Sequence, residues 1–211
     1  MITFVPYPNF DNVAKCLDDK RLGAQRYEAW SILKWLRNPT EYPKLVKAGY
    51  CCMWRGYEDA LIQYINAMLV EWAARGKTNN LLKPFDPVRK LNTSNDSTPP
   101  MPPWLGHPTL QSCHRHALIS KFPQHYGQFG WFEDGSAYTG SYLWPDQTEQ
   151  GDWVLRWPKS VNLKPISLEV VAGNQNMTRK KQLRKREVKQ QEDSKNAQRP
   201  KRMKLRNGKK L

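Results

Sequence analysis

The chain has 211 residues and a net charge of +15, which suits one folded domain with an appendage. No apolar run approaches the roughly 20 residues that a transmembrane helix needs, and the first residues lack the pattern of a signal peptide. The four cysteines show no spacing typical of a disulfide framework. The sequence therefore predicts an intracellular protein in a reducing compartment, with no membrane partner.

The positive charge is concentrated at the C-terminal end. Residues 174–211 contain 15 Lys and Arg and three acidic residues, so they carry +12 of the net charge and leave +3 for residues 1–173. This segment has no aromatic residue, so it cannot bury enough apolar surface to offset the entropy of ordering it. We expect residues 166–211 to be a disordered basic tail that binds nucleic acid by releasing counterions. The candidate tail contacts are Arg179, Lys180, Lys181, Arg184, Lys185, Arg186, Lys201, Arg202, Lys204 and Arg206.

The tail also has two simpler interpretations, a solubilising segment and a nuclear-import signal. The run from Arg199 to Arg206 has the basic composition of an import signal. Both interpretations are compatible with nucleic-acid binding. The sequence therefore predicts a protein located in the nucleus or on a viral genome, with chromatin or that genome as a candidate partner.

The first element expected in chain order is an extended arm. Residues 1–10, MITFVPYPNF, are apolar and contain two prolines, and each proline disfavours helix in the residue before it. A helical stretch should follow. From Asn12 to Arg37 there is no proline, and apolar residues recur every three or four positions until Pro39 ends the pattern.

Two further helices are expected. Residues 57–75 have one wide apolar face, and Gly76 supplies a stop signal. A third helix should run from Thr109 to Lys121. Between them, residues 77–103 contain several prolines and no periodicity, which predicts a long connection.

Residues 126–157 are rich in aromatic residues and show no clean period. Aromatic residues at this density usually pack against helices, and the alternative is a platform that stacks on bases. The fold class expected from these elements is all-α, a compact monomeric helical domain over residues 1–165 with long irregular aromatic-rich segments.

Glu28 is the acidic residue that stands out as a catalytic candidate. On a helix its neighbours at steps of three, four and seven include Arg21, Ala24, Gln25 and Ser31. A partly buried carboxylate could be kept ionised there by Arg21, and the small side chains of Ala24 and Ser31 would leave room for a ligand. The alternative is an ordinary surface ion pair.

Five motifs carry a resemblance to a known family. They are FVPYPNF, LDDKRLGAQRYEA, MWRGYEDAL, PPWLG and CHRHALISKFPQHY, in this order over residues 4–126. The segment RLGAQRYE, which ends at Glu28, resembles the glutamate-bearing first helix of the pyrimidine-dimer DNA glycosylases typified by a phage endonuclease V. The set as a whole is similar to a largely uncharacterised branch of that superfamily.

The resemblance implies an endonuclease V-like helical fold in which a free N-terminal amine lies beside the glutamate. That amine attacks the sugar C1′ of a damaged nucleotide and forms an imine, while the glutamate assists proton transfers. An α-amine suits this task because it is less basic than a lysine, so more of it is neutral and nucleophilic at pH 7. No cofactor is implied.

Carried onto this chain, the resemblance assigns the catalytic roles to Met1 and Glu28. The phage enzyme exposes a small residue once its initiator methionine is removed, whereas the bulky Ile2 of this chain disfavours removal and leaves the free amine on Met1. Tyr27 stands directly before the glutamate, where the phage enzyme has arginine, and Arg26 is one place earlier.

Several polar residues in the shared motifs are candidates for DNA contact. Arginine and lysine could bind phosphates, and Tyr126 could stack on a base. His114 is either a proton carrier or a buried structural histidine, and Trp54 is either core or part of the interface. The candidate DNA-binding residues are Arg21, Gln25, Arg26, Arg55, His114, Arg115, Lys121 and Tyr126.

A metal site is not expected. Cys113, His114 and His116 are close in sequence, and Cys51 and Cys52 could lie nearby, but the spacing matches no common zinc pattern. There is also no Gly-rich phosphate loop, Walker lysine or serine elbow. Metal and nucleotide cofactors are therefore both predicted to be absent.

The function expected from the sequence is that of a double-stranded-DNA-binding protein that acts as a base-excision DNA glycosylase and AP lyase on damaged or modified bases. The first alternative is a non-catalytic DNA-binding, chromatin or genome-packaging protein that retains the glycosylase fold. RNA binding or processing is a third, because an aromatic-rich segment can stack on single strands.

Overall fold

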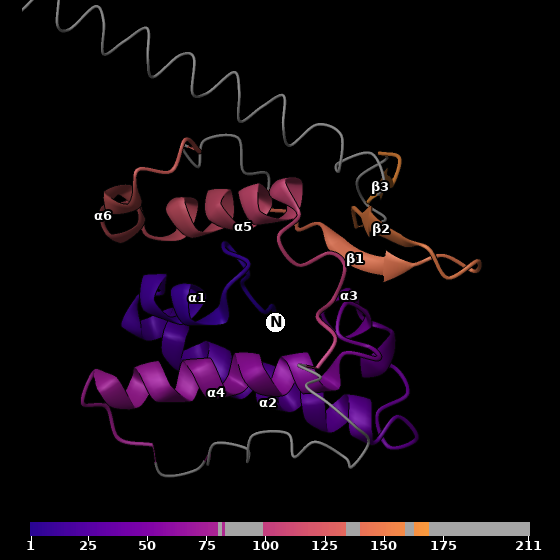
Figure 1. Ribbon diagram of the computed structural model, residues 1–211, viewed down its shortest axis with the longest axis horizontal. Coiled ribbons are helices and arrows are strands. Elements are labelled where there is room, and N and C mark those ends of the chain that lie inside the picture. Colours follow the sequence, from indigo (N-terminus) through magenta and orange to yellow (C-terminus); the bar gives the residue numbers. More distant parts are fainter. Residues whose placement is uncertain (80–81, 83–98, 134–139, 159–162, 169–211) are drawn as a thin grey trace, which may run out of the picture. The chain divides into compact units, whose positions relative to one another are not determined.

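The computed structural model describes residues 1–79, 82, 99–133, 140–158 and 163–168 (Figure 1). The chain divides into two units, Met1–Leu168 and Glu169–Leu211. The second unit lies outside the described residues, and so do all ten predicted tail contacts. The fold described below is that of the first unit.

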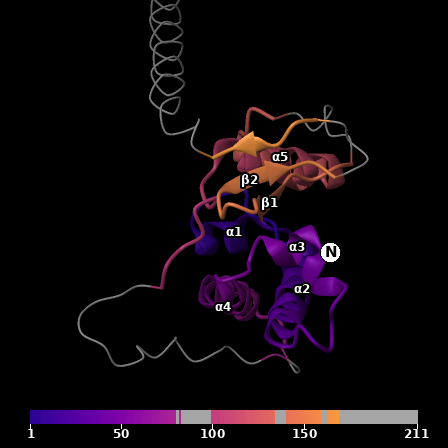
Figure 2. The same cartoon turned by 90° about the vertical axis from the view of Figure 1, so that its right-hand side faces the viewer.

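The described residues form helices and one small sheet. The helical elements are α1 (Phe10–Cys16), α2 (Asp19–Arg37), η1 (Leu45–Lys47), α3 (Gly49–Cys52), α4 (Glu58–Ala74), α5 (Pro108–Lys121), α6 (Pro123–Tyr126) and η2 (Gly127–Phe129). The strands are β1 (Trp144–Gln147), β2 (Trp153–Arg156) and β3 (Ile166–Ser167). Helix α4 packs against both α1 and α2. Helix α5 lies on the other side of the N-terminal arm from α2 and α4 (Figures 1 and 2).

The predicted extended arm is confirmed. Residues 1–5 have no helical structure, and Ile2, Thr3, Phe4 and Val5 are all buried. The arm therefore belongs to the core of the domain, between α5 and the pair formed by α2 and α4.

The single helical stretch predicted from Asn12 to Arg37 is in fact two helices. Helix α1 begins earlier, where the Asn9 side chain accepts a hydrogen bond from the Asn12 nitrogen, and it ends at Cys16. Leu17 then has extended backbone angles, φ −71° and ψ 137°, before α2 begins at Asp19. Neither proline nor glycine marks this break, so the sequence pattern missed it.

Arg75, at the end of α4, explains why the chain can break there. Its guanidinium donates hydrogen bonds to the carbonyl oxygens of Ala14, Lys15 and Leu17 at 3.2, 3.1 and 2.8 Å. The end of a helix leaves its last carbonyl groups without intrahelical partners, and Arg75 provides a donor to them. The Ala14 carbonyl also accepts from the Leu17 nitrogen at 3.3 Å. The same guanidinium forms ion pairs with Glu71 at 2.8 Å and with Asp19, the first residue of α2, at 3.0 Å.

The other two predicted helices are confirmed. Helix α4 matches the apolar stretch expected over residues 57–75, and Gly76 follows it with a positive φ of 69°. A left-handed backbone of this kind favours glycine at a helix end. Helix α5 begins with Pro108, and the His107 side chain caps it by accepting from the Thr109 nitrogen at 3.2 Å.

The expectation of an all-α fold needs correction, because part of the aromatic-rich segment forms a sheet. Strands β1, β2 and β3 make an antiparallel sheet in that order, with Trp144 opposite Arg156. The turn between β1 and β2 contains Gly151 with a φ of 91°. The strands span only two to four residues each, too few to show a reliable alternating pattern. The last strand lies beyond residue 165, the predicted domain end.

Among the described residues, no helix is both long and apolar enough to cross a membrane.

Replacing Arg75 should destabilise the domain. We expect Arg75→Ala to lower the free energy of unfolding by about 2–3 kcal/mol, because three carbonyl groups and two carboxylates lose a charged donor. Urea denaturation followed by circular dichroism measures this change. Lys77→Ala is the matched control, since it removes only an exposed ion pair with Asp19 and should cost under about 1 kcal/mol. Equal losses in the two variants would show that Arg75 does not cap α1.

Candidate active site

Glu28 lies midway along α2 and contacts the start of the arm. Its carboxylate Oε2 accepts a hydrogen bond from the backbone nitrogen of Ile2 at 2.8 Å. Glu28 is half-buried, whereas Met1 is 49% exposed. The N-terminus therefore lies beside α2, as both ribbon views show (Figures 1 and 2).

Side chains from α2 and α4 hold the next part of the arm. Gln25 Oε1 accepts from the Phe4 nitrogen at 3.0 Å. The Tyr64 hydroxyl lies 2.7 Å from Gln25 Oε1 and 3.0 Å from the Phe4 carbonyl oxygen, and its single proton serves one of them at a time. Burial raises the pKa of Tyr64 well above its usual value, so the hydroxyl stays a neutral donor.

Helix α5 holds Val5 through a histidine. The Val5 nitrogen donates to His114 Nδ1 at 2.8 Å. Burial, and to a lesser extent the neighbouring Arg115 charge, lower the pKa of His114 to about 3, so the ring is neutral near pH 7. With Nδ1 acting as acceptor, the proton resides on Nε2, which has no hydrogen-bond partner in the described part of the chain. His114 is thus placed as a buried structural histidine.

Thr3 is held by a tryptophan. The Trp54 indole nitrogen donates to Thr3 Oγ1 at 2.8 Å, and that hydroxyl lies 3.6 Å from the Met53 sulfur. Trp54 is fully buried, as its core interpretation predicted. Each residue from Ile2 to Val5 is therefore fixed by at least one side chain from another part of the domain.

This arrangement has a clear chemical capacity. In the chain that begins at Met1 the Ile2 nitrogen is a peptide N–H, so the Glu28 carboxylate is held one residue from the terminal amine. A positioned carboxylate can accept and return protons for a reacting group brought to it. Ala24 is exposed and Ser31 is half-buried, one turn before and one turn after Glu28 on α2. Neither small side chain is fully buried, and their role in leaving room for a ligand stays a prediction.

Two of the arginines predicted to bind DNA have partners on or beside α2. Arg21 donates to Asp18 Oδ1 at 2.8 Å, and its side chain is 16% exposed. Arg26 is buried, donates to Asn79 Oδ1 at 2.9 Å, and stacks over the Trp72 ring with its central carbon 3.9 Å from the ring centroid. Gln25, as described above, holds the arm.

The remaining predicted cations differ in how freely they face solvent. Arg115 pairs with the buried Glu133 at 2.9 Å and also donates to the Pro6 carbonyl oxygen at 3.1 Å. Arg55 is exposed and donates to the Val46 carbonyl oxygen at 2.8 Å. Lys121 is exposed in the last turn of α5. Arg55 and Lys121 are thus the predicted cations most open to a ligand.

Tyr126 lies inside the domain. It is fully buried, its ring stacks on Trp131 at 5.9 Å between centroids, and its hydroxyl donates to Asp18 Oδ1 at 2.7 Å. The Asp18 nitrogen in turn donates to the hydroxyl oxygen at 3.2 Å. Burial and the bond to Asp18 both raise the pKa of Tyr126. In this arrangement no face of the ring is open to a DNA base.

Sequence reasoning missed two parts of the site. Tyr64 lies within residues 57–75, for which the sequence predicted only an apolar face, although a buried tyrosine hydroxyl usually finds a hydrogen-bond partner. The nitrogen of Ile2, rather than that of Met1, bonds to Glu28. No sequence pattern specifies that one-residue register.

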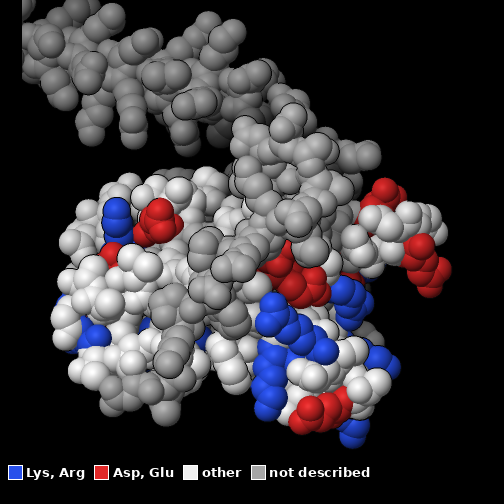
Figure 3. Space-filling model, turned by 60° about the horizontal axis from the view of Figure 1, so that its bottom comes forward, with Lys and Arg blue, Asp and Glu red and all other residues white. Residues whose placement is uncertain are grey.

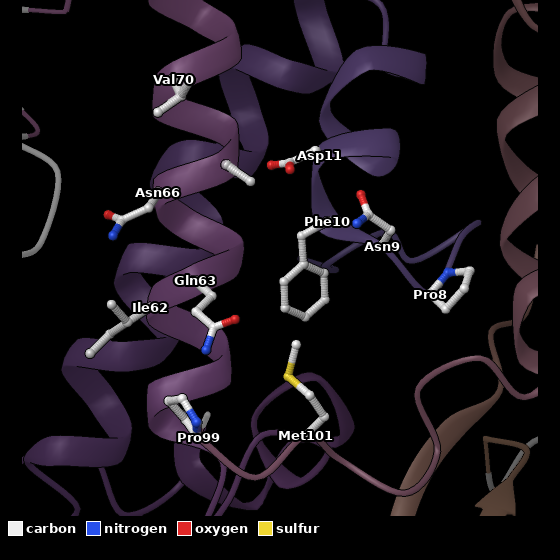
Figure 4. Close-up of a pocket in the computed structure, with 11 residues that line it drawn as sticks. Pro8, Asn9, Phe10, Asp11, Ile62, Gln63, Asn66, Val70, Pro99 and Met101 are labelled. Carbon is white, nitrogen blue, oxygen red and sulfur yellow. The ribbon is translucent and has the colours of Figure 1, made fainter. Parts of the chain in front are cut away.

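The described surface also contains a cavity that is separate from Glu28. It has a volume of about 650 Å³ and lies between the start of α1 and one side of α4 (Figure 4). Phe10 and Met101 point into it, and Asn66 and Val70 line the α4 side. None of the catalytic or DNA-binding residues predicted from the sequence lines this cavity.

No metal centre is evident where side chains are described. Within those ranges, no three His, Cys, Asp or Glu side chains lie close enough to hold a metal ion. Cys113, His114 and His116 are all on α5, but His114 is occupied by Val5.

The arm, the glutamate-bearing helix and their supporting helices together define a helical domain in which the backbone nitrogen of the second residue bonds to a carboxylate. Residues 1–84 match the family model of pyrimidine dimer DNA glycosylase, which confirms the superfamily resemblance. The matched stretch contains the arm, Glu28 and every element from α1 to α4. At the family level the match supports a DNA-repair glycosylase, and a glycosylase of this kind binds DNA. No curated protein and no solved structure matches the chain.

Acid should weaken the domain through His114. The folded-state pKa is about 3 and the unfolded value is about 6.5, so only the unfolded chain takes up this proton between those pH values. The stabilisation is complete above about pH 6.5 and falls by up to about 1.4 kcal/mol per pH unit below it. Urea unfolding at several pH values measures the slope.

His114→Asn is the informative variant, because its amide oxygen can take the place of Nδ1 as acceptor for Val5 but does not titrate. We expect it to show a shallower loss of stability between about pH 6.5 and 4 than the wild type. His107, whose pKa burial also lowers, is present in both proteins. Identical slopes would contradict the assignment.

Proposed function

We propose that this chain is a base-excision DNA glycosylase with AP lyase activity, acting on damaged or modified bases in duplex DNA. The observation that carries the proposal is the 2.8 Å hydrogen bond between the Ile2 nitrogen and Glu28, because it places the N-terminus at a half-buried carboxylate. The family match over residues 1–84 supports the same class of reaction.

In the proposed reaction, the neutral N-terminal amine attacks C1′ of the damaged nucleotide. The bond from C1′ to the base breaks, and the base leaves with the bonding electrons and takes up a proton. The nitrogen then gives up one proton, and its electron pair forms a double bond to C1′ as the bond from C1′ to the ring oxygen breaks. The ring oxygen takes up a proton, which opens the sugar and leaves a protonated imine. Loss of a proton from C2′ then breaks the 3′ carbon–oxygen bond, which cuts the strand. Glu28 is the proposed carrier of protons in these steps.

The proposed nucleophile is the Met1 amine in a chain that retains this residue. Met1 is exposed and adjoins the nitrogen bonded to Glu28. In a chain that starts at Ile2, the amine would instead be the nitrogen at 2.8 Å from the carboxylate. The two forms therefore differ by one residue in the position of the free amine relative to the nitrogen that bonds to Glu28.

The proposal predicts a covalent adduct. The full-length protein incubated with duplex containing an abasic site and borohydride should be trapped on that DNA through its N-terminal residue. Glu28→Gln should reduce single-turnover strand scission by roughly 10²–10⁴-fold, the usual contribution of a positioned acid or base. Glu41→Gln, an exposed carboxylate beyond the end of α2, is the matched control and should behave like wild type.

Two results would contradict this mechanism. One is a wild-type protein that forms no adduct, and the other is a Glu28→Gln variant with full turnover. A tight, salt-sensitive complex without scission on any lesion would support the non-catalytic DNA-binding alternative instead. Base excision without scission would indicate a glycosylase that lacks the lyase step.

Ile2→Ala distinguishes the two candidate amines. The smaller residue permits removal of Met1, so the free amine becomes the nitrogen that bonds to Glu28. Mass spectrometry of the trapped peptide then identifies the reacting residue. We expect Met1 to carry the adduct in the wild type, and the newly exposed alanine to carry it in the variant. Acetylation of the N-terminus should prevent trapping in both proteins.

We further propose that the basic tail increases the affinity for DNA without taking part in the chemistry. Changing Arg179, Lys180, Lys181, Arg184, Lys185 and Arg186 to Gln should lower the slope of log K against log salt by about 0.9 for each phosphate that the tail no longer neutralises. Single-turnover excision at saturating protein should be unchanged. A salt slope equal to that of wild type would show that these residues do not bind DNA.

A further inference from the structure

Helix α2, which carries Glu28, also presents two large aromatic side chains to solvent. Tyr27 is 41% exposed and Trp30 is 37% exposed, and they lie three residues apart on one face of the helix. Burying such rings is favourable, so exposing two of them side by side is unusual for a surface that binds nothing.

The same helix is strongly basic. Between Lys20 and Arg37, Glu28 is its sole acidic residue, and it also carries Arg21, Arg26 and Lys34. Lys20 and Lys34 are exposed on the same face as Tyr27. Basic side chains also gather on the right of the surface shown in Figure 3, with a few acidic ones among them. The exposed rings are therefore bordered by cations. Such a surface suits a partner that has both flat apolar groups and negative charge.

The aromatic side chains rest on a built support. The guanidinium of Arg26 lies 5.2 Å from the Tyr27 ring centroid and 3.9 Å from that of Trp72. Arg26 is in turn held by Asn79 at 2.9 Å. Trp30 lines a shallow hollow of about 210 Å³ together with Leu33 and the last turn of α2. Tyr27 is thus backed by a fixed cation rather than by other apolar groups.

The aromatic face and the carboxylate are neighbours on the helix. Successive residues are rotated by about 100°, so Ala24 and Ser31 lie between the directions of Tyr27 and Glu28. Both side chains are small, so neither would prevent one ligand from contacting the Tyr27 ring and the carboxylate together. Around the helix Tyr27 lies between Glu28 and Trp30, about 100° from the carboxylate and about 60° from Trp30. A strand that reacts at Glu28 and continues over this face would therefore meet Tyr27 first and Trp30 beyond it.

We propose that Tyr27 and Trp30 stack on a base left without its stacking partner at the damaged position of duplex DNA, while Lys20 and Lys34 bind the flanking phosphates. This inference rests on the proposed function, since it assumes that the DNA reacts at Glu28. Stacking on aromatic rings is tolerant of base identity, so this surface recognises the distortion rather than the sequence.

Binding to an unreactive substrate tests the proposal. The probe is a duplex with a tetrahydrofuran abasic analogue, which cannot form an imine, and 2-aminopurine opposite it; an undamaged duplex is the reference. With the full-length protein, Tyr27→Ala combined with Trp30→Ala should lower the affinity for the analogue duplex about tenfold or more and the affinity for the undamaged duplex much less. The 2-aminopurine fluorescence change on binding should be lost as well.

Matched variants separate stacking from charge and from folding. Tyr27→Phe combined with Trp30→Phe keeps two rings and should retain the preference for the analogue duplex. Val70→Ala removes an exposed apolar side chain on α4 and should have no effect. Lys20→Ala combined with Lys34→Ala should weaken binding to both duplexes and lower the salt slope by up to about 2.

The proposal is overturned if the double alanine variant keeps the wild-type ratio of affinities for the two duplexes. Equal competition by single-stranded RNA would likewise overturn the assignment to duplex DNA. Because the analogue cannot react, these outcomes are independent of the Glu28→Gln and trapping results. A loss of chemistry with intact damage recognition would count against the proposed reaction alone.

Discussion

The architecture depends on how the N-terminal arm satisfies its backbone without a neighbouring strand. Buried N–H and C=O groups need partners, and an extended segment usually finds them in a sheet. In this domain they are provided by side chains, namely Glu28 for Ile2, Gln25 and Tyr64 for Phe4, and His114 for Val5. The arm is consequently held by three helices at once. Its backbone nitrogens at positions 2, 4 and 5 are each bonded to a side chain of one of those helices.

Holding the arm in this way occupies polar side chains that would otherwise be free to contact DNA. Gln25 and His114 hold the arm, Arg115 joins Glu133 to the Pro6 carbonyl, and Arg26 lies beneath the surface of α2. Buried charges and amides of this kind are costly to leave without partners, so they cannot readily be released to bind a ligand. The DNA contacts proposed for the domain therefore fall to exposed side chains and to the basic tail.

Sequence periodicity was sufficient for the arm, for α4 and for α5, because each is bounded by proline or glycine. It was insufficient where tertiary contacts decide the outcome. The break before Asp18 depends on Arg75, which lies 58 residues from Leu17, and the sheet consists of strands too short to show their own period. For the candidate site, spacing identified Glu28 and its small neighbours. It could not show that Arg26 would be buried, because that depends on Trp72 in another helix.

The hydrogen-bond partners of the arm are synthesised at different times, because they lie at different distances along the chain. Phe4 bonds to a side chain 21 residues later, whereas Val5 bonds to one 109 residues later. At roughly 5–20 residues per second, the arm emerges several seconds or more before His114 has been made. During that interval its first residues remain open to the enzymes that trim or acetylate new chains. The chemical identity of the terminal amine is thus settled before α5 has bound the arm, and folding afterwards brings whichever form has been made to the side of α2.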